Sequence, residues 1–386
     1  MKRSIAQYHL PGLFEFYELY KVFLPLFREH REYFYDWCDI GSVYGAPADC
    51  IWGGGRAGFG DDDAGKVLDL MKEYGISARL TFSNSLLREE HLLDKKCNAL
   101  CKLFEEAGDT QSESVSNSNM QDKSIKDIQE NNVQPKAIQN GVIVHADLLL
   151  DYLKKNYSNL YFVSSTTKVL INFQDFLKEV KREDFQYVVP DFRLNKSFDR
   201  LNTLTQIEKD KVELLCNECC WFRCKDRKRC YETVSRKNLG ENCHEHHCAA
   251  PDAEEGYRFS KAMKNPGFIS TEDIQNVYLR WDFPILKLKD GDLAVHWCWN
   301  FCFIIWSRRN IRYISEKQYI LIICWICFRF RAFYSFRMEI KPGIWYNLNI
   351  KSRFKEVKIY VVSSGCWCNY FCNSKFDVGI DRKSVV

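Results

Sequence analysis

Residues 141–157, GVIVHADLLLDYLKKNY, contain the pattern that decides the fold. The first five residues form a short β-branched run that is typical of a buried strand. Residues 146–157 then place leucines and charged side chains at the spacing of an amphipathic helix. A strand that runs directly into a helix is the repeating unit of α/β proteins, so this stretch predicts an α/β fold.

The same unit recurs from Tyr44 onward. Alternating strands and helices predict a parallel sheet covered by helices. Roughly eight units, without a Gly-x-Gly-x-x-Gly fingerprint, favour a TIM-type (β/α)8 barrel over a doubly wound sheet. The other strands are predicted at residues 48–52, 76–82, 160–163, 187–189, 212–215 and 285–288, and two further helices at 64–74 and 172–181.

Two regions depart from this alternation of strands and helices. Residues 107–137 are rich in Gln, Ser, Asn, Asp and Lys and contain no aromatic residue, which predicts a disordered insertion. After Asp290 the chain holds six of its 10 tryptophans and seven of its 18 cysteines without a clear periodicity. If the reading frame over residues 290–306 is shifted one base earlier, permitted codons can encode a glycine turn followed by an apolar helix. We therefore expect an α/β barrel at 1–290, incomplete at its C-terminus, and an aberrant, frameshifted tail without a defined domain at 291–386.

Composition restricts the location and the partners. The formal net charge is +4, which is too small to indicate a nucleic-acid-binding surface by itself. The N-terminus lacks the pattern of a secretory signal, and the longest apolar runs are about half the roughly 20 residues that span a bilayer. We expect a cytoplasmic protein without a membrane segment or an obligate protein partner. In that compartment 18 cysteines indicate metal binding, catalysis or burial rather than disulfide bonds.

Polar clusters follow several predicted strands. Asp191 and Arg193 follow the strand at 187–189, and Asn217 and Glu218 follow the strand at 212–215. In a barrel these strand ends converge on one face, where active sites are built. We predict these four residues to be catalytic, with Glu218 as acid or base and Arg193 as an anion clamp. The alternatives are helix caps and a structural ion pair between Asp191 and Arg193.

Short cysteine spacings follow the same strand. Cys220-x-x-x-Cys224 and Cys243-x-x-x-x-Cys248 can supply the four thiolates of a 4Fe–4S cluster. Zinc is the alternative, bound by the same cysteines or with substitution by His244, His246 or His247. A site without metal is the third interpretation. Cysteines 38, 50, 97, 101 and 216 are predicted to be buried in the core instead.

Basic and aromatic residues alternate after Cys220. Positive charges beside aromatic rings suit an RNA backbone with stacked bases. The alternative is a solvated, charged face of a helix. The residues are Trp221, Phe222, Lys225, Arg227, Lys228, Arg229 and Tyr231.

In order, the strand-end motifs resemble those of the U-thirty-two family of collagenase-like peptidases. They are VVPDFRLN at 188–195, LCNE at 215–218, the pair Cys220 and Cys224, and ILKLK at 285–289. The resemblance covers about residues 48–290 and implies a TIM-type barrel. It also implies either peptidase activity or, as in members with a four-iron cluster, hydroxylation of RNA bases or quinone precursors. The resemblance implies that Cys220 and Cys224 match the start of the family's cysteine motif and that Cys243 and Cys248 are the remaining pair, with Cys219 or Cys230 as the alternatives.

The function expected from these observations is modification, of the hydroxylation type, of RNA or a small metabolite by an iron–sulfur barrel protein. One alternative is a peptidase that hydrolyses peptide bonds. The other is a non-catalytic protein with a structural zinc knuckle.

Overall fold

The computed structural model describes residues 5–47, 49–53, 63–108, 138–244, 246–255 and 259–289, together with strands at 346–351, 356–361 and 380–381. The chain forms two compact units, Met1–Glu316 and Lys317–Val386. In the first unit, eight parallel strands lie among the described residues. In the second unit, the described strands pair in antiparallel fashion.

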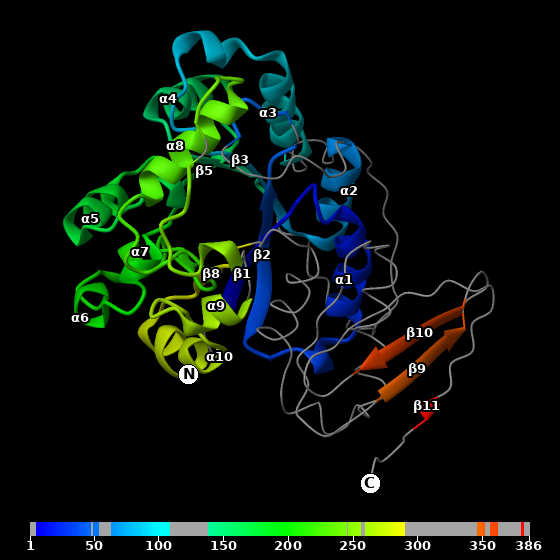
Figure 1. Ribbon diagram of the computed structural model, residues 1–386. Helices are drawn as coiled ribbons and strands as arrows, with labels where there is room; N and C mark the ends of the chain where they lie inside the picture. The colour runs from blue at the N-terminus through cyan, green and yellow to red at the C-terminus, as the bar shows by residue number, and fades with distance from the viewer. Residues whose placement is uncertain are drawn as a thin grey trace, which may run out of the picture. The chain divides into compact units, whose positions relative to one another are not determined.

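The eight strands of the first unit form one curved sheet, in which β1 and β2 lie side by side at the centre of the unit (Figure 1). From β1 to β6 each strand pairs with the next one in the sequence, β7 pairs with β8, and β8 pairs back with β1. A single parallel bridge between Val188 and Val212 joins β6 to the residues before β7. The strands are β1 (Ala6–Pro11), β2 (Cys38–Gly45), β3 (Ser77–Phe82), β4 (Gly141–Val144), β5 (Tyr161–Ser164), β6 (Tyr187–Val188), β7 (Leu214–Leu215) and β8 (Ile285–Lys287).

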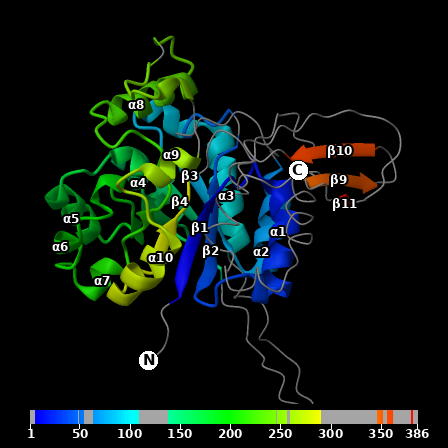
Figure 2. The ribbon, with the colours of Figure 1, turned by 60° about the horizontal axis from the view of Figure 1, so that its bottom comes forward.

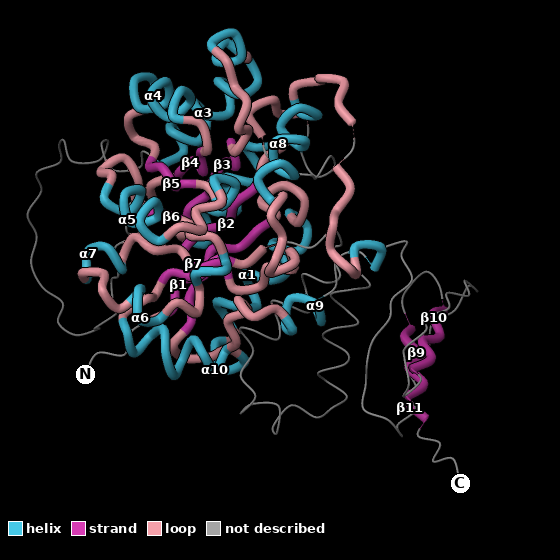
Figure 3. The backbone as a smooth tube through the Cα atoms, turned by 60° about the vertical axis from the view of Figure 1, so that its left-hand side comes forward, coloured by secondary structure: helices cyan, strands magenta, loops and turns pink. Residues whose placement is uncertain are grey.

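Helices surround these strands (Figure 3). Their sequences explain where they begin and which face they bury: the side chain of Asn172 caps α5, which buries Phe173, Phe176 and Val180. The helices are α1 (Tyr17–Glu29), α2 (Ala64–Tyr74), α3 (Lys95–Gly108), α4 (Asp147–Asn156), α5 (Phe173–Lys181), α6 (Phe198–Leu201), α7 (Gln206–Lys209), α8 (Arg227–Asn238), α9 (Phe259–Lys264) and α10 (Thr271–Asp273). The TIM-type fold class predicted from the sequence is confirmed.

The predicted strand at residues 48–52 is wrong. Asp49 has a φ of 57° and the amide of Gly53 donates to the carbonyl of Cys50 at 2.9 Å, so residues 49–53 form a turn. The first two strands, β1 and β2, were not predicted. Their sequences, AQYHLP and CDIGSVYG, carry polar residues that interrupt the apolar pattern.

Several sequence predictions lie outside the described residues. Ala107 and Gly108 belong to α3, while 109–137, the remainder of the predicted insertion, is not described. Residues 290–306, whose shifted codons can encode the missing final helix, are also not described. The frameshifted tail therefore stays a prediction.

In the second unit three described strands form a small antiparallel sheet (Figure 2). They are β9 (Tyr346–Lys351), β10 (Glu356–Val361) and β11 (Ile380–Asp381), in the order β10-β9-β11. Across the described parts of both units, no helix combines the length and apolar character needed to cross a lipid bilayer.

Candidate functional site

The C-terminal ends of three neighbouring strands bring the predicted site residues together. Asp191 follows β6, Asn217 and Glu218 follow β7, and Lys289 follows β8. Asp191, Asn217 and Glu218 are buried. This end of the barrel is called the mouth below, and it is where TIM-type enzymes carry their active sites.

Helix α8 crosses the mouth. At its N-terminal end, Arg227 contacts Glu218 and Asp191. Near its other end, the hydroxyl of Ser235 accepts a hydrogen bond of 3.0 Å from the amide of Ser85, which lies beyond β3. Since β3 and β7 lie four positions apart in the ring of eight, the two contacts are on opposite sides of the barrel. The helix therefore acts as a cap over the mouth.

Glu218 is 2% exposed, and both oxygens of its carboxylate accept hydrogen bonds. Its Oε1 accepts hydrogen bonds of 3.0 Å from the amides of Cys219 and Cys220 and from Lys289 Nζ, and its Oε2 accepts one of 2.6 Å from Arg227 Nη2. Burial raises the pKa of Glu218, but the charges of Arg227 and Lys289 outweigh burial and hold that pKa far below its ordinary value. This carboxylate stays ionised, which favours an electrostatic role over the acid or base role expected from the sequence.

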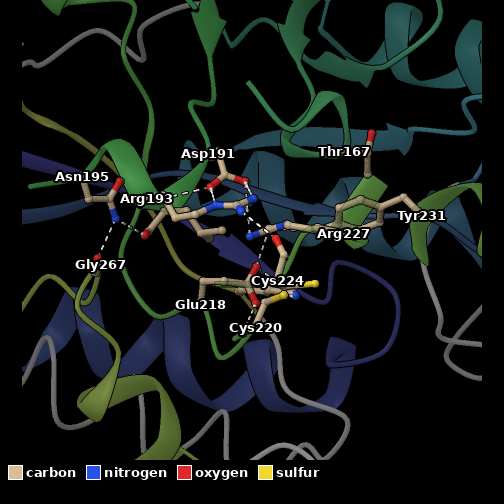
Figure 4. Close-up of polar contacts among 12 residues, drawn as sticks. Thr167, Asp191, Arg193, Asn195, Glu218, Cys220, Cys224, Arg227, Tyr231 and Gly267 are labelled. Atoms are coloured by element: carbon tan, nitrogen blue, oxygen red, sulfur yellow. Dashed lines mark hydrogen bonds and ion pairs between the residues drawn. The ribbon is translucent and has the colours of Figure 1, made fainter. Parts of the chain in front are cut away.

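Asp191 and Arg193 form the ion pair that the sequence left as an alternative (Figure 4). Arg193 Nε lies 2.6 Å from Asp191 Oδ1, and its Nη2 lies 3.0 Å from Oδ2. Arg193 Nη1 also donates to the carbonyl of Cys224 at 2.8 Å. The pair therefore fixes the loop between β7 and α8 against the end of β6.

Asn217 joins two strand ends. Its side-chain amide donates to the carbonyl of Lys289 at 2.9 Å, and its side-chain oxygen accepts from the amide of Lys289 at 2.7 Å. These two side-chain hydrogen bonds take the place of backbone pairing beyond the ends of β7 and β8. Asn217 thus positions Lys289 at the mouth.

Arg227 is the functional candidate that sequence reasoning did not assign to the catalytic set. Its side chain is 3% exposed, and Nη2 donates to Glu218 and, at 3.0 Å, to the hydroxyl of Tyr231. Nη1 lies 3.6 Å from Asp191 Oδ2, which is too long for a hydrogen bond. Within the described part of the chain, Nε and Nη1 of Arg227 have no hydrogen-bond acceptor. The basic run around Arg227 was the available signal, but it did not distinguish a buried arginine from exposed ones.

The four predicted cysteine ligands do not come together. Cys220 and Cys224 lie near each other (Figure 4). Burial raises the pKa of Cys220 to about 12, and the charge of Glu218 adds to the rise. The thiol of Cys243 instead faces the carbonyl of Thr233 at 3.9 Å, and Cys248 is exposed. No three His, Cys, Asp or Glu side chains among the described residues are placed to hold one metal ion. Among the described residues, Cys220 and Cys224 are thus the two proposed ligands that lie together, and the four-cysteine ligand set stays a prediction.

A second charged cluster lies inside the barrel and was missed. Glu213 accepts hydrogen bonds from Arg79 Nη1 at 2.8 Å and from Lys287 Nζ at 2.7 Å, and His9 Nδ1 lies 2.8 Å from the same carboxylate. All four residues are buried. Burial, followed by the charge of Arg79, lowers the pKa of His9 to about 4, so His9 is neutral and donates its Nδ1 proton to Glu213.

Comparisons with known proteins give two structural similarities. The protein is similar to the U32 peptidase Mk0906, with a TM-score of 0.44 and 12% identity over 76% of this chain and 96% of that chain. It is also similar to the spore cortex-lytic enzyme SleL of Bacillus megaterium QM B1551, with a TM-score of 0.33 and 9% identity over 79% of this chain and 75% of that chain. No protein-family profile and no curated protein sequence matches the chain. The first of these structures is a member of the family that the sequence motifs resemble.

Proposed function

We propose that this protein is an enzyme that binds an anionic group of its substrate through Arg227 at the mouth of the barrel. The observation that carries the proposal is the pair of buried N–H groups, on Nε and Nη1 of Arg227, that have no acceptor among the described residues. A buried donor without a partner costs about 1–3 kcal/mol. A carboxylate or phosphate oxygen would satisfy either of these donors with a charge-assisted hydrogen bond.

The charges of the mouth support an anionic substrate. Three cations, Arg193, Arg227 and Lys289, face two carboxylates, Asp191 and Glu218. The local balance is one positive charge in a largely buried environment, where charge interactions are stronger than in water. An anion at Arg227 would neutralise it.

The substrate we favour is a small anionic metabolite. The Arg227 side chain is only 3% exposed, which suits a small group better than a polymer backbone. RNA is the second candidate, because Lys225, Lys228 and Arg229 are exposed near Trp221, which is 36% exposed. We place this enzyme in the cytoplasm, in keeping with its cysteine-rich composition.

The reaction and the cofactor are proposed from the cysteine spacing and the family resemblance. The reaction is modification of the hydroxylation type, and the cofactor is a 4Fe–4S cluster, with zinc as the alternative. Of the proposed ligands, Cys220 and Cys224 already lie together, whereas Cys243 and Cys248 would have to approach them. When bound, such a cluster would supply electron transfer. Peptide hydrolysis is the rival activity.

Calorimetric titration of the full-length chain tests the binding site. The probes are citrate, inorganic phosphate and a single-stranded RNA oligomer, and the variants are Arg227→Lys and the matched control Arg229→Lys. Lysine keeps the charge but lacks the guanidinium N–H donors, so we expect Arg227→Lys to weaken binding of the small anion about tenfold, near the value of one charge-assisted hydrogen bond. Arg229→Lys should leave that binding unchanged.

RNA binding would give a different pattern. Its affinity would fall steeply with salt and would respond to charge removal in Arg229→Gln as well. Equal small-anion affinity for the wild-type and Arg227→Lys proteins would contradict the proposed site. Unfolding curves of both variants show whether a loss of binding reflects a loss of fold.

A further inference from the structure

Two buried cysteines far apart in the sequence lie in contact. Cys50 belongs to the turn at residues 49–53, and Cys97 lies in the first turn of α3. Their sulfur atoms are 3.1 Å apart, and both side chains are buried, at 5% and 0% exposure. A disulfide bond has a sulfur–sulfur distance of about 2.05 Å, so an approach of about 1 Å would join them.

The turn that carries Cys50 supports helix α8. The amide of Asn84 donates to the carbonyl of Trp52 at 3.0 Å, and its side chain donates to the carbonyls of Ile51 at 2.8 Å and Ser235 at 3.2 Å. Asn238 of α8 donates to the carbonyl of Gly53 at 2.6 Å. The contact between Cys50 and Cys97 therefore adjoins the turn whose hydrogen bonds hold the C-terminal part of α8.

We propose that Cys50 and Cys97 form a reversible disulfide bond when a small disulfide such as oxidised glutathione is present, and that this bond stiffens the support of α8. The inference does not depend on the proposed substrate. It concerns the opposite end of α8 from Arg227.

The disulfide bond forms by thiol–disulfide exchange in two steps. The thiolate of Cys50 attacks one sulfur of the small disulfide, forms a mixed disulfide and releases one small thiolate, which takes up a proton. The thiolate of Cys97, after losing its proton to solvent, then attacks the sulfur of Cys50, and the second small thiolate leaves. Two electrons pass from the cysteine pair to the small disulfide, and two small thiols are formed.

Cys50 is suited to be the attacking sulfur. The hydrogen bond from the thiol of Cys97 lowers the pKa of Cys50, more than burial raises it. Cys101, one turn further along α3, is also buried but has a pKa raised well above its ordinary value by burial and by Cys50. Attack needs the turn to open locally, and Asp49, its first residue, has the strained φ of 57°.

The test equilibrates the full-length protein with reduced and oxidised glutathione at a series of ratios, blocks remaining thiols by alkylation and maps the digest by mass spectrometry. We expect a linked peptide pair containing Cys50 and Cys97, whose abundance rises with the oxidised fraction and falls again on reduction. The Cys101→Ala variant, as matched control, should give the same pair. Cys97→Ala should abolish it.

Hydrogen exchange measures the second part of the proposal. Amide exchange at residues 235–239 should slow by at least threefold in the oxidised protein relative to the reduced protein. Absence of the linked pair in the wild-type protein at any ratio overturns the disulfide. Formation of the pair with unchanged exchange at residues 235–239 overturns the coupling to α8. Since both readouts use the wild-type chain, a poorly folding variant does not obscure the result.

Discussion

Glu218 and Arg227 form a buried ion pair, with Oε2 and Nη2 2.6 Å apart, although Glu218 follows β7 and Arg227 begins α8. The pair is extended by Lys289 beyond β8, whose Nζ lies 3.0 Å from Oε1. One carboxylate therefore holds the cap helix and two strand ends together. It also fixes the position of the arginine that we propose to bind substrate.

Replacing Glu218 by Gln should destabilise the protein by about 3–5 kcal/mol, because it removes the close partner of the buried Arg227 and leaves it only the more distant Asp191. Chemical unfolding followed by circular dichroism measures the change. Glu232→Gln, on α8 but outside the buried ion network, is the matched control and should change stability by less than about 0.5 kcal/mol. Equal stability of both variants would show that the ion pair contributes little.

Folding stability should decrease as the pH falls from about 6.5 to 4. Burial and the charges of Arg79 and Lys287 lower the pKa of His9 to about 4. Between that value and about 6.5 the unfolded chain binds a proton at this histidine and the folded protein does not, so protonation favours unfolding. The contribution of His9 is about 1.4 kcal/mol per pH unit, or roughly 3 kcal/mol over the interval.

Urea unfolding at pH 7.5, 6 and 5 measures this dependence in the wild type and in His9→Gln. The variant should show a shallower decrease, whatever its absolute stability. Some decrease remains because burial and the charges of Lys168 and Lys228 also lower the pKa of His145 to about 4. Parallel curves for the two proteins would mean that His9 is not the group that titrates.

Gly141→Ala should destabilise the barrel by about 1–3 kcal/mol through overpacking. A Cβ atom at Gly141, the first residue of β4, would lie 2.6 Å from the ring of Tyr161 on the neighbouring strand. Gly65→Ala in α2 is the matched control, since its Cβ would meet only Asp63 Oδ1 at 3.4 Å, and it should be neutral or stabilising. Thermal unfolding of both variants gives the comparison, and a neutral Gly141→Ala would contradict the packing described for β4 and β5.

The proposed 4Fe–4S cluster predicts about four iron and four sulfide per chain after anaerobic purification, with a brown colour. Cys220→Ala should lose the iron. Cys216→Ala should keep it, because this thiol is buried and faces the carbonyl of Leu214. Stoichiometric zinc would support the alternative metal, and a protein that takes up neither metal under these conditions would contradict both.

Much of the fold could be predicted from local pattern. The sequence at 64–74 predicts α2 with the bounds that the structure has, since its apolar spacing agrees with an N-cap at Asp63 and a left-handed Gly75. The strand β1 could not be predicted in the same way. It places His9 against Glu213 in the barrel interior, so a polar residue on an inward position is satisfied by a partner about two hundred positions away.

The candidate site shows the same limit. The rule that polar residues at parallel strand ends meet on one face correctly grouped Asp191, Asn217 and Glu218. It could not show that the side chain of Asn217 is hydrogen-bonded to the backbone of Lys289. Nor could it separate Arg227 from its exposed neighbour Lys228, because burial depends on where α8 lies.

The sequence by itself determined the α/β barrel and the face on which its polar strand ends gather, because strand and helix periodicity and chain order are local properties. Only the tertiary structure decided that α8 crosses the mouth, that Glu218 is neutralised by Arg227 and Lys289, and that Cys50 meets Cys97. Those outcomes depend on contacts between residues distant in the chain. Their electrostatic and packing energies exist only once the barrel has brought them together.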